Sequence, residues 1–312
     1  MHEIWQQKEV GEKRMLEQTV KNEVKVDGIN VYNGKRNSVI FHPQEAQRGI
    51  IFALGKEKIR ADINNAANKK RTIVVSNGKI EIFLVEHLLS AVYALGIDNL
   101  VIELSDKICP TLPFCASGYI KALEEGIIPQ DTQRTYWKYS KEAQITVSTK
   151  DSNKPDSMTV SSQKGFSIDY HAYYPHLVLG HQNFRLSVSI ENYKEQIMNA
   201  RAPTLFPVFM RNEFIYSLFL AFGKRGFHGI NEQNYLLIAS QNSDRYFNGK
   251  EFGVLYEGNE FVRHKILDVM GTLALTGRQF KDTCFKFNMT GHKFDIYALR
   301  CLFNAGAFEK SE

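Results

Sequence analysis

The two halves of the chain present the same order of elements, and this order restricts the fold more than any other feature. Between residues 16 and 85, short β-type runs such as NSVIFHP and RGIIFAL precede a helical stretch, a strand and a second helix. From residue 143, runs such as AQITVST and GFSIDYHAYY again precede a helix, a strand and a helix. Runs of β-branched and aromatic residues between turn signals are typical of strands. The order therefore predicts an α+β fold of two similar domains packed together.

Apolar residues at helical spacing mark the four helices. We expect them at residues 85–96, 117–127, 261–277 and 292–306, with Gly96 and Gly277 as C-caps. Each pair of helices would cover one face of a largely antiparallel sheet. A polar stretch containing Pro129 is the best boundary signal. We therefore predict an N-terminal extension at residues 1–15, a first α+β domain at 16–128 and a second at 129–312.

Composition and charge restrict the class of protein. The 312 residues are 43% hydrophobic and 23% charged, which is typical of a soluble globular protein. No apolar run approaches the ~20 residues of a membrane span, and the N-terminus lacks the apolar core of a secretory signal. We therefore expect a cytoplasmic protein. The net charge of +5 comes without a dense Lys/Arg block, which argues against a nucleic-acid partner. It is equally compatible with a phosphate-bearing substrate and with an anionic membrane surface.

Two residues four apart on one predicted helix form the first candidate for a metal site. His264 and Asp268 would point to the same face, where an imidazole and a carboxylate can bind one ion. Taken alone, a surface hydrogen bond is the more frequent reason for such a pair. The four cysteines offer no Cys-x-x-Cys pair, so a structural zinc finger is not expected and reduced thiols are.

Three further residues complete the candidate site. A catalytic zinc ion takes three protein ligands and leaves one position open, and His87 would supply the third ligand. The adjacent Glu86 could then take a proton from water, as a general base. His292, which precedes the last helix in TGHK, is a candidate general acid, because a leaving amine must be protonated. A capping or core role is the more common one for each histidine by itself.

The runs VEHLLSAVYALGIDN, FVRHKILDVMG and TGHK resemble the signatures of the UDP-3-O-acyl-N-acetylglucosamine deacetylase family. The resemblance extends over residues 16–306, in the same order and at similar spacing. It implies zinc-dependent hydrolysis of the acetamide of a UDP-linked acylated amino sugar, with release of acetate. This reaction is the committed step of lipid A synthesis in Gram-negative bacteria. The resemblance also implies two β-α-α-β domains with the active site between them.

The same resemblance implies a role for individual residues. Zinc would be held by His87, His264 and Asp268, with Glu86 as base and His292 as acid or as cationic stabiliser of the oxyanion. Thr204 would help to polarise the substrate carbonyl, and Lys265 would meet polar or phosphate groups of the substrate. The segment at 205–222, which begins with Leu205 and Phe206, would form an apolar passage for the acyl chain. An ordinary core helix is the alternative for that segment.

Four positions depart from the family's pattern. Tyr32 replaces a histidine, and Pro113-Phe114-Cys115 replaces an Asp-Gly-Ser run where the family shapes its sugar pocket. Residues 223–234 replace a Gly-Gly-Ser-rich stretch. Thr272 replaces an aspartate that supports the catalytic histidine, and a carboxylate raises a histidine pKa and fixes its tautomer. His292 would therefore be neutral more often at pH 7.

Other readings of the sequence stay open. A divergent relative that binds zinc but turns over poorly would act as a binding or regulatory protein. A nucleic-acid or scaffold protein on a similar fold is a third class, since fold alone does not fix function. A His/His/Asp set suits both Zn²⁺ and Fe²⁺. The resemblance suggests a monomer and is compatible with peripheral contact with the inner membrane.

Overall fold

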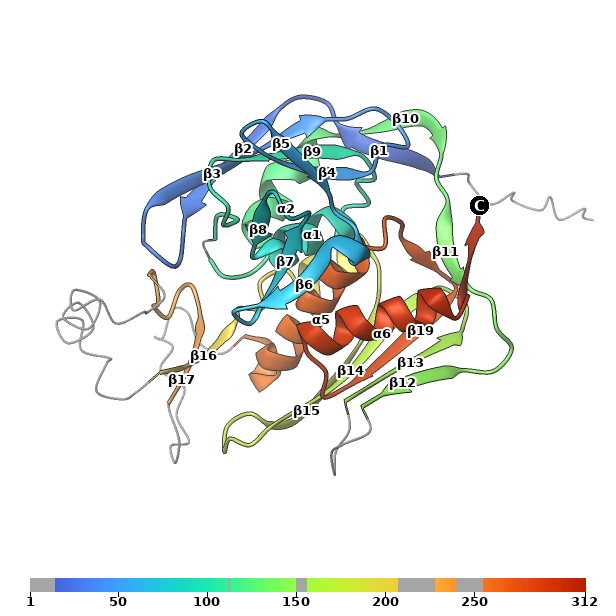
Figure 1. Ribbon diagram of the computed structural model, residues 1–312. Helices are drawn as coiled ribbons and strands as arrows, with labels where there is room; N and C mark the ends of the chain where they lie inside the picture. The colour runs from blue at the N-terminus through green and yellow to red at the C-terminus, as the bar shows by residue number, and fades with distance from the viewer. Residues whose placement is uncertain (1–14, 112, 150–155, 207–227, 240–254) are drawn as a thin grey trace, which may run out of the picture.

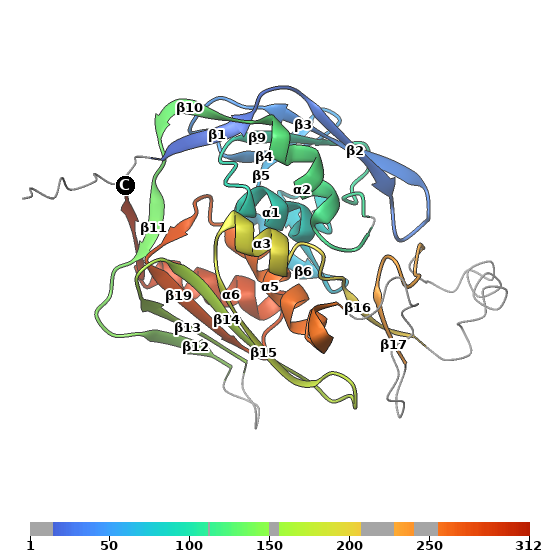
Figure 2. The ribbon, with the colours of Figure 1, turned by 180° about the vertical axis from the view of Figure 1, so that it is seen from behind.

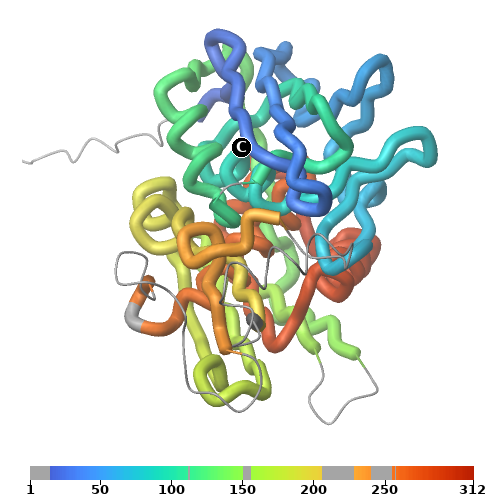
Figure 3. Tube along the Cα trace, turned by 90° about the vertical axis from the view of Figure 1, so that its left-hand side faces the viewer, coloured from blue at the N-terminus to red at the C-terminus, as the bar shows by residue number. Residues whose placement is uncertain are grey.

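The computed structural model describes residues 15–111, 113–149, 156–206, 228–239 and 255–312. Apart from residue 15, the expected N-terminal extension therefore lies outside the described residues. Two five-stranded sheets form the outer layers, and helices lie between them (Figure 1). The first half of the chain builds the layer at one end of the molecule, and the second half builds the layer at the other end (Figure 3). The mixed architecture confirms the predicted α+β class.

The two large sheets share one topology. In the first, the strand order is β2 (Val24–Ile29), β3 (Arg36–Pro43), β9 (Leu100–Leu104), β4 (Ile50–Leu54) and β5 (Glu57–Arg60). In the second, it is β12 (Ile145–Ser148), β13 (Ser157–Ser162), β19 (Thr283–Asn288), β14 (Phe166–Tyr174) and β15 (Gly180–Ser187). In each sheet the central strand runs antiparallel to one neighbour and parallel to the other. The halves therefore match strand by strand, although their sequences do not.

Four smaller sheets of two or three strands complete the described part of the fold. They are β1 (Leu16–Val20) with β10 (Ile127–Gln133); β6 (Ala66–Lys69), β7 (Thr72–Ser76) and β8 (Glu81–Phe83); β11 (Tyr136–Tyr139), β18 (Phe280–Lys281) and β20 (Phe308–Ser311); and β16 (Pro203–Phe206) with β17 (Leu236–Ala239). The expected boundary between residues 128 and 129 falls inside β10. The division into domains stays a prediction.

The helices between the sheets are α1 (Val85–Ala94), α2 (Ser117–Leu123), α3 (Ile190–Gln196), α5 (Glu260–Ala274) and α6 (His292–Asn304). Figure 2 shows α1 of the first half beside α5 of the second, at the centre of the molecule. Most residues of both helices are buried, which places this layer in the core between the two halves. The buried set includes polar residues as well as apolar ones. In the described part of the chain, no helix combines the length and the apolar character that crossing a bilayer requires.

One glycine sets how closely α1 and α5 approach. A Cβ atom on Gly271 of α5 would lie 2.1 Å from the carbonyl oxygen of Glu86 in α1. Real side chains essentially never come so close, so any other residue would force the helices apart. The contact holds the start of α1 against the middle of α5. These are the parts of the two helices that carry the candidate site residues.

Candidate metal centre and active site

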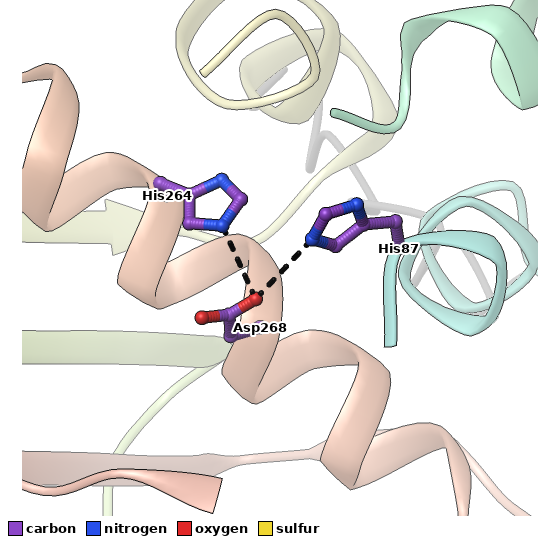
Figure 4. A group of neighbouring side chains, drawn as sticks. All are labelled: His87, His264 and Asp268. Atoms are coloured by element: carbon purple, nitrogen blue, oxygen red, sulfur yellow. Dashed lines mark ion pairs between the residues drawn. The ribbon is translucent and has the colours of Figure 1, made fainter. Parts of the chain in front are cut away.

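Three predicted ligands from the two halves meet in the buried core. His87 comes from α1, and His264 and Asp268 come from α5, one helical turn apart (Figure 4). The Nε2 atoms of His87 and His264 lie 3.6 and 3.4 Å from Oδ1 of Asp268. One ligand atom from each residue lies within 4.8 Å of the other two. This spacing leaves room for one ion among the three atoms.

The donor set fits a metal ion because its oxygen is otherwise unsatisfied. Oδ1 of Asp268 is buried and receives no hydrogen bond from any described residue. A buried carboxylate oxygen without a partner is costly, and a cation is the group that would satisfy it. Two imidazole nitrogens and one carboxylate oxygen form the kind of three-ligand set that leaves a fourth position open at a catalytic zinc site.

His264 is held in the tautomer that a metal ligand needs. Its Nδ1 lies 2.9 Å from the carbonyl oxygen of Ala200 and donates a hydrogen bond to it. The proton on Nδ1 leaves the lone pair of Nε2 directed at the ion position. Burial lowers the pKa of His264 to about 4, against the opposing effect of Asp268. The ring is therefore neutral at physiological pH, as metal binding requires.

Asp268 carries the negative charge of the centre. Burial alone would raise its pKa, but His264, Lys265 and His292 hold the pKa of this carboxyl well below its usual range. Lys265 donates a hydrogen bond from Nζ to Oδ2 at 3.1 Å. Oδ2 is therefore paired with a cation, and Oδ1 is left for the ion position.

Glu86 has one oxygen fixed and one directed into the site. The hydroxyl of Thr72 and the backbone N–H of Ile73 both donate to Oε2, each at 3.0 Å. The N–H of Leu84, a residue with φ 60° that precedes α1, donates in turn to the Thr72 hydroxyl. The other oxygen, Oε1, lies 4.0 Å from Nε2 of His292. This arrangement suits a carboxylate that exchanges a proton through Oε1.

His292 begins α6 and faces both carboxylates. Its Nε2 lies 3.9 Å from Oδ2 of Asp268, in addition to its approach to Glu86. Its Nδ1 is buried and has no hydrogen-bond partner among the described residues. Thr272 does not supply one, because its hydroxyl donates to the backbone carbonyl of Asp268 at 3.1 Å. The structure thus brings Glu86 and His292 together beside the three candidate ligands.

A cavity of about 690 Å³ opens over these residues. Its lining includes Lys265 of α5 and, from β16, Thr204 and Leu205. The side chain of Phe206, and the part of the expected acyl passage from residue 207 to 222, lie outside the described residues. Part of the stretch at 223–234 lies outside them as well.

Tyr32 and Phe114, two of the residues that differ from the family's pattern, line this cavity. Burial, helped by the charge of Glu86, raises the pKa of Tyr32 to about 12, so its phenol is protonated. Phe114 meets the ring of His87 edge-on, with centroids 4.8 Å apart. It also stacks on Tyr235 at 4.8 Å. Two aromatic rings therefore lie beside the candidate ligand His87, at a place where the family's pattern has glycine.

Sequence reasoning missed Tyr235 and two basic residues of the cavity, Lys70 and Arg71. The run of basic residues at 69–71 was the available signal for the latter pair, and it precedes a β-type run. Tyr235 directly precedes the apolar run LLIA of β17, which marks it as the edge of a buried strand. Neither sequence signal indicates that the side chains of Lys70, Arg71 and Tyr235 line the cavity.

Over residues 17–304, the chain matches the family described as UDP-3-O-acyl N-acetylglycosamine deacetylase. The chain belongs to this family. It is 30% identical to the UDP-3-O-acyl-N-acetylglucosamine deacetylase of Thermodesulfovibrio yellowstonii, over 95% of each protein. It is 30% identical to the Helicobacter hepaticus enzyme of that name, over 84% of this chain and 82% of the relative. Membership confirms the resemblance found in the three sequence runs.

Proposed function

We propose that this protein is a metal-dependent deacetylase that hydrolyses the acetamide of UDP-3-O-acyl-N-acetylglucosamine. The reaction releases acetate and is the committed step of lipid A synthesis. The observation that carries the proposal is Oδ1 of Asp268, which has no hydrogen-bond partner in the described part of the chain and faces two imidazole nitrogens beside Glu86 and His292. Membership in the deacetylase family supports the same activity.

His87, His264 and Asp268 would hold the ion, and we propose zinc. Ferrous iron suits the same donors, so the test includes both ions. When bound, such an ion acts as a Lewis acid and lowers the pKa of a coordinated water molecule to ~7. The neutral His264 and the charged Asp268 need no change of protonation to receive it.

Glu86 and His292 carry the proton transfers. Glu86 takes the proton of the attacking water on Oε1, while Thr72 and Ile73 hold its other oxygen in place. His292 gives a proton from Nε2 to the leaving amine, or stabilises the oxyanion as a cation before that step. Both groups act within a buried site, where electrostatic stabilisation is stronger than in water.

The remaining residues bind and orient the substrate. Thr204 polarises the acetyl carbonyl from the wall formed by β16. Lys265, whose Nζ contacts Asp268, also meets polar or phosphate groups of the substrate. Leu205 and Phe206 contact the acyl chain. The cytoplasmic location, the monomeric state, the contact with the inner membrane and the lack of a nucleic-acid partner stay predictions.

The substrate can be tested with two UDP-sugars. The purified protein should release acetate from UDP-3-O-acyl-N-acetylglucosamine, and far more slowly from UDP-N-acetylglucosamine, which lacks the acyl chain. Equal rates on both would contradict the acyl-binding role of Leu205 and Phe206. No release from either sugar by metal-loaded protein would overturn the proposed activity.

A second candidate is a metal-binding relative with weak or no turnover. The observation that favours it is Nδ1 of His292, which finds no hydrogen-bond partner within the described ranges. The family's pattern supplies a carboxylate there, and this chain has Thr272. Under this alternative, the protein binds a stoichiometric metal ion and the acylated UDP-sugar but releases no acetate.

A further inference from the structure

A buried ion pair joins the start of α5 to the segment that precedes β16. Arg201 precedes β16, and Glu260 is the first residue of α5; their side chains are only 4% and 0% exposed. Arg201 donates from Nε to Oε1 at 2.8 Å and from Nη2 to Oε2 at 3.0 Å. Its backbone N–H donates to the same Oε1 at 2.9 Å. The residue is therefore bound to α5 by both its main chain and its side chain.

The residues on either side of Arg201 contact the active site. The carbonyl of Ala200 accepts the hydrogen bond from Nδ1 of His264, four residues after Glu260 on α5. The N–H of Ala202 donates to the carbonyl of Phe114 at 3.1 Å, and the ring of Phe114 contacts His87. The Nη1 atom of Arg201 also donates to the carbonyl of Glu232 at 2.6 Å. One arginine thus fixes the segment that meets two metal ligands.

We infer that Arg201 and Glu260 are positioning residues for the metal ligand His264. Their pairing sets the distance between residue 200 and α5, and this distance determines whether the Ala200 carbonyl reaches Nδ1. The carbonyl in turn fixes the ring orientation and the tautomer of His264. Partners that orient a metal ligand typically change metal affinity 10–100-fold when removed. The inference rests on the metal centre of the proposed function.

The chain offers a matched control in a second buried pair. Arg134 donates from Nε and Nη2 to Oδ2 of Asp98 at 3.0 and 2.7 Å. These side chains are 5% and 16% exposed, and neither lines the active-site cavity. Breaking this pair should disturb the fold to a similar degree without touching a metal ligand.

The test compares three variants with the unchanged protein. Arg201→Lys keeps the charge but loses the paired fork of hydrogen bonds. The double variant Arg201→Met with Glu260→Met removes both charges, so that no buried charge is left unpaired. Arg134→Lys is the control. Zinc affinity is measured by competition with a chelator, and the visible spectrum of the Co²⁺-substituted protein reports the ligand geometry.

Zinc affinity should fall about tenfold in Arg201→Lys and further in the double variant, with altered Co²⁺ absorption bands. Arg134→Lys should keep the affinity and the spectrum of the unchanged protein. Unchanged affinity and spectrum in both site variants would overturn the inference, and so would an equal loss in the control. If the protein without any substitution binds no zinc, the metal centre is overturned as well. Zinc binding without acetate release would overturn only the proposed activity.

Discussion

At the scale of single residues, each carboxylate of the site has one oxygen held by the protein and one oxygen available for chemistry. In Asp268 the paired oxygen is Oδ2, bound by Lys265, and in Glu86 it is Oε2, bound by Thr72 and Ile73. The available oxygens face the ion position and His292. A fixed oxygen orients the carboxylate before the reaction, so less reorganisation remains for the transition state.

Glu86→Gln tests the general base. Glutamine has nearly the same shape and can still accept hydrogen bonds from Thr72 and Ile73, but it cannot take a proton. We expect kcat to fall by about 10²–10⁴ while the bound metal stays at the level of the unchanged protein. Metal analysis and acetate release on one preparation check this. A fully active variant would exclude Glu86 as the base.

Thr272→Asp tests the support of His292. A carboxylate at position 272 would offer Nδ1 of His292 the acceptor that it lacks among the described residues, and would stabilise the cationic form of the ring. We expect kcat to rise and the alkaline limb of the pH profile to move to higher pH. Thr272→Asn, which adds no charge, should leave that limb in place. Coinciding profiles for the three proteins would mean that His292 needs no carboxylate from position 272.

A buried carboxyl of α6 predicts a pH-dependent stability. Burial raises the pKa of Asp295 to about 7, against a favourable hydrogen bond from Thr290. The pKa of Asp295 is therefore higher in the folded state than in the unfolded state. Its contribution to folding stability is fully present below about pH 4. That contribution is lost as the pH rises towards 7. Relative to the unchanged protein, the free energy of unfolding of Asp295→Asn should therefore rise by on the order of 3 kcal/mol between pH 4 and pH 7.

Urea unfolding of metal-free protein at several pH values measures this difference. Chelator is present throughout, so that metal binding by the folded state does not contribute. The pKa of His264 is lowered to about 4, so its effect on stability has the opposite pH dependence. This effect is the same in both proteins and cancels in the difference between them. A stability difference that stays constant over this pH range would contradict the raised pKa of Asp295.

At the scale of elements, sequence patterns predicted α1, α2, α5 and α6 but missed α3 (Ile190–Gln196), and they did not predict where the helices end. The helix expected at 85–96 ends at residue 94, and the one expected at 117–127 ends at residue 123. A short 3-10 helix, η2 (Glu124–Gly126), follows the latter, because Ile127 already starts β10 and pairs with β1. The pairing of β10 with β1 therefore sets the C-terminal end of α2. The local spacing of apolar residues contains no information about that pairing.

The packing of α1 against α5 gives the prediction for this scale. Gly271→Ala would place a Cβ atom 2.1 Å from the carbonyl oxygen of Glu86 and push the helices apart. We expect a loss of about 3 kcal/mol in unfolding free energy and a loss of zinc affinity, because His87 moves away from Asp268. Gly126→Ala is the control, since its Cβ would meet Val24 at an ordinary 3.9 Å. Similar behaviour of the two variants would contradict the role of Gly271.

At the scale of the whole molecule, the site exists because two halves with one topology meet. The i, i+4 spacing of His264 and Asp268 could be recognised from the sequence, because one helix face contains both. Glu86 and His87 lie on α1 and His292 on α6, so helix spacing could not connect them to His264 and Asp268. They were chosen as the residue types that a catalytic zinc site needs, and the family resemblance supported that choice. The partners that orient the site, such as the Ala200 carbonyl and the Ile73 N–H, are backbone groups without a sequence signature. Their positions follow from the fold alone.

The central claim is a hydrolytic metal centre shared by the two halves. It is tested most directly by metal analysis and acetate release from UDP-3-O-acyl-N-acetylglucosamine on the same preparation. We predict about one zinc or iron ion per chain. Acetate release should stop when a chelator removes the ion and return when zinc is added back. A protein that carries the ion and releases no acetate, or that releases acetate equally well without it, would contradict the claim.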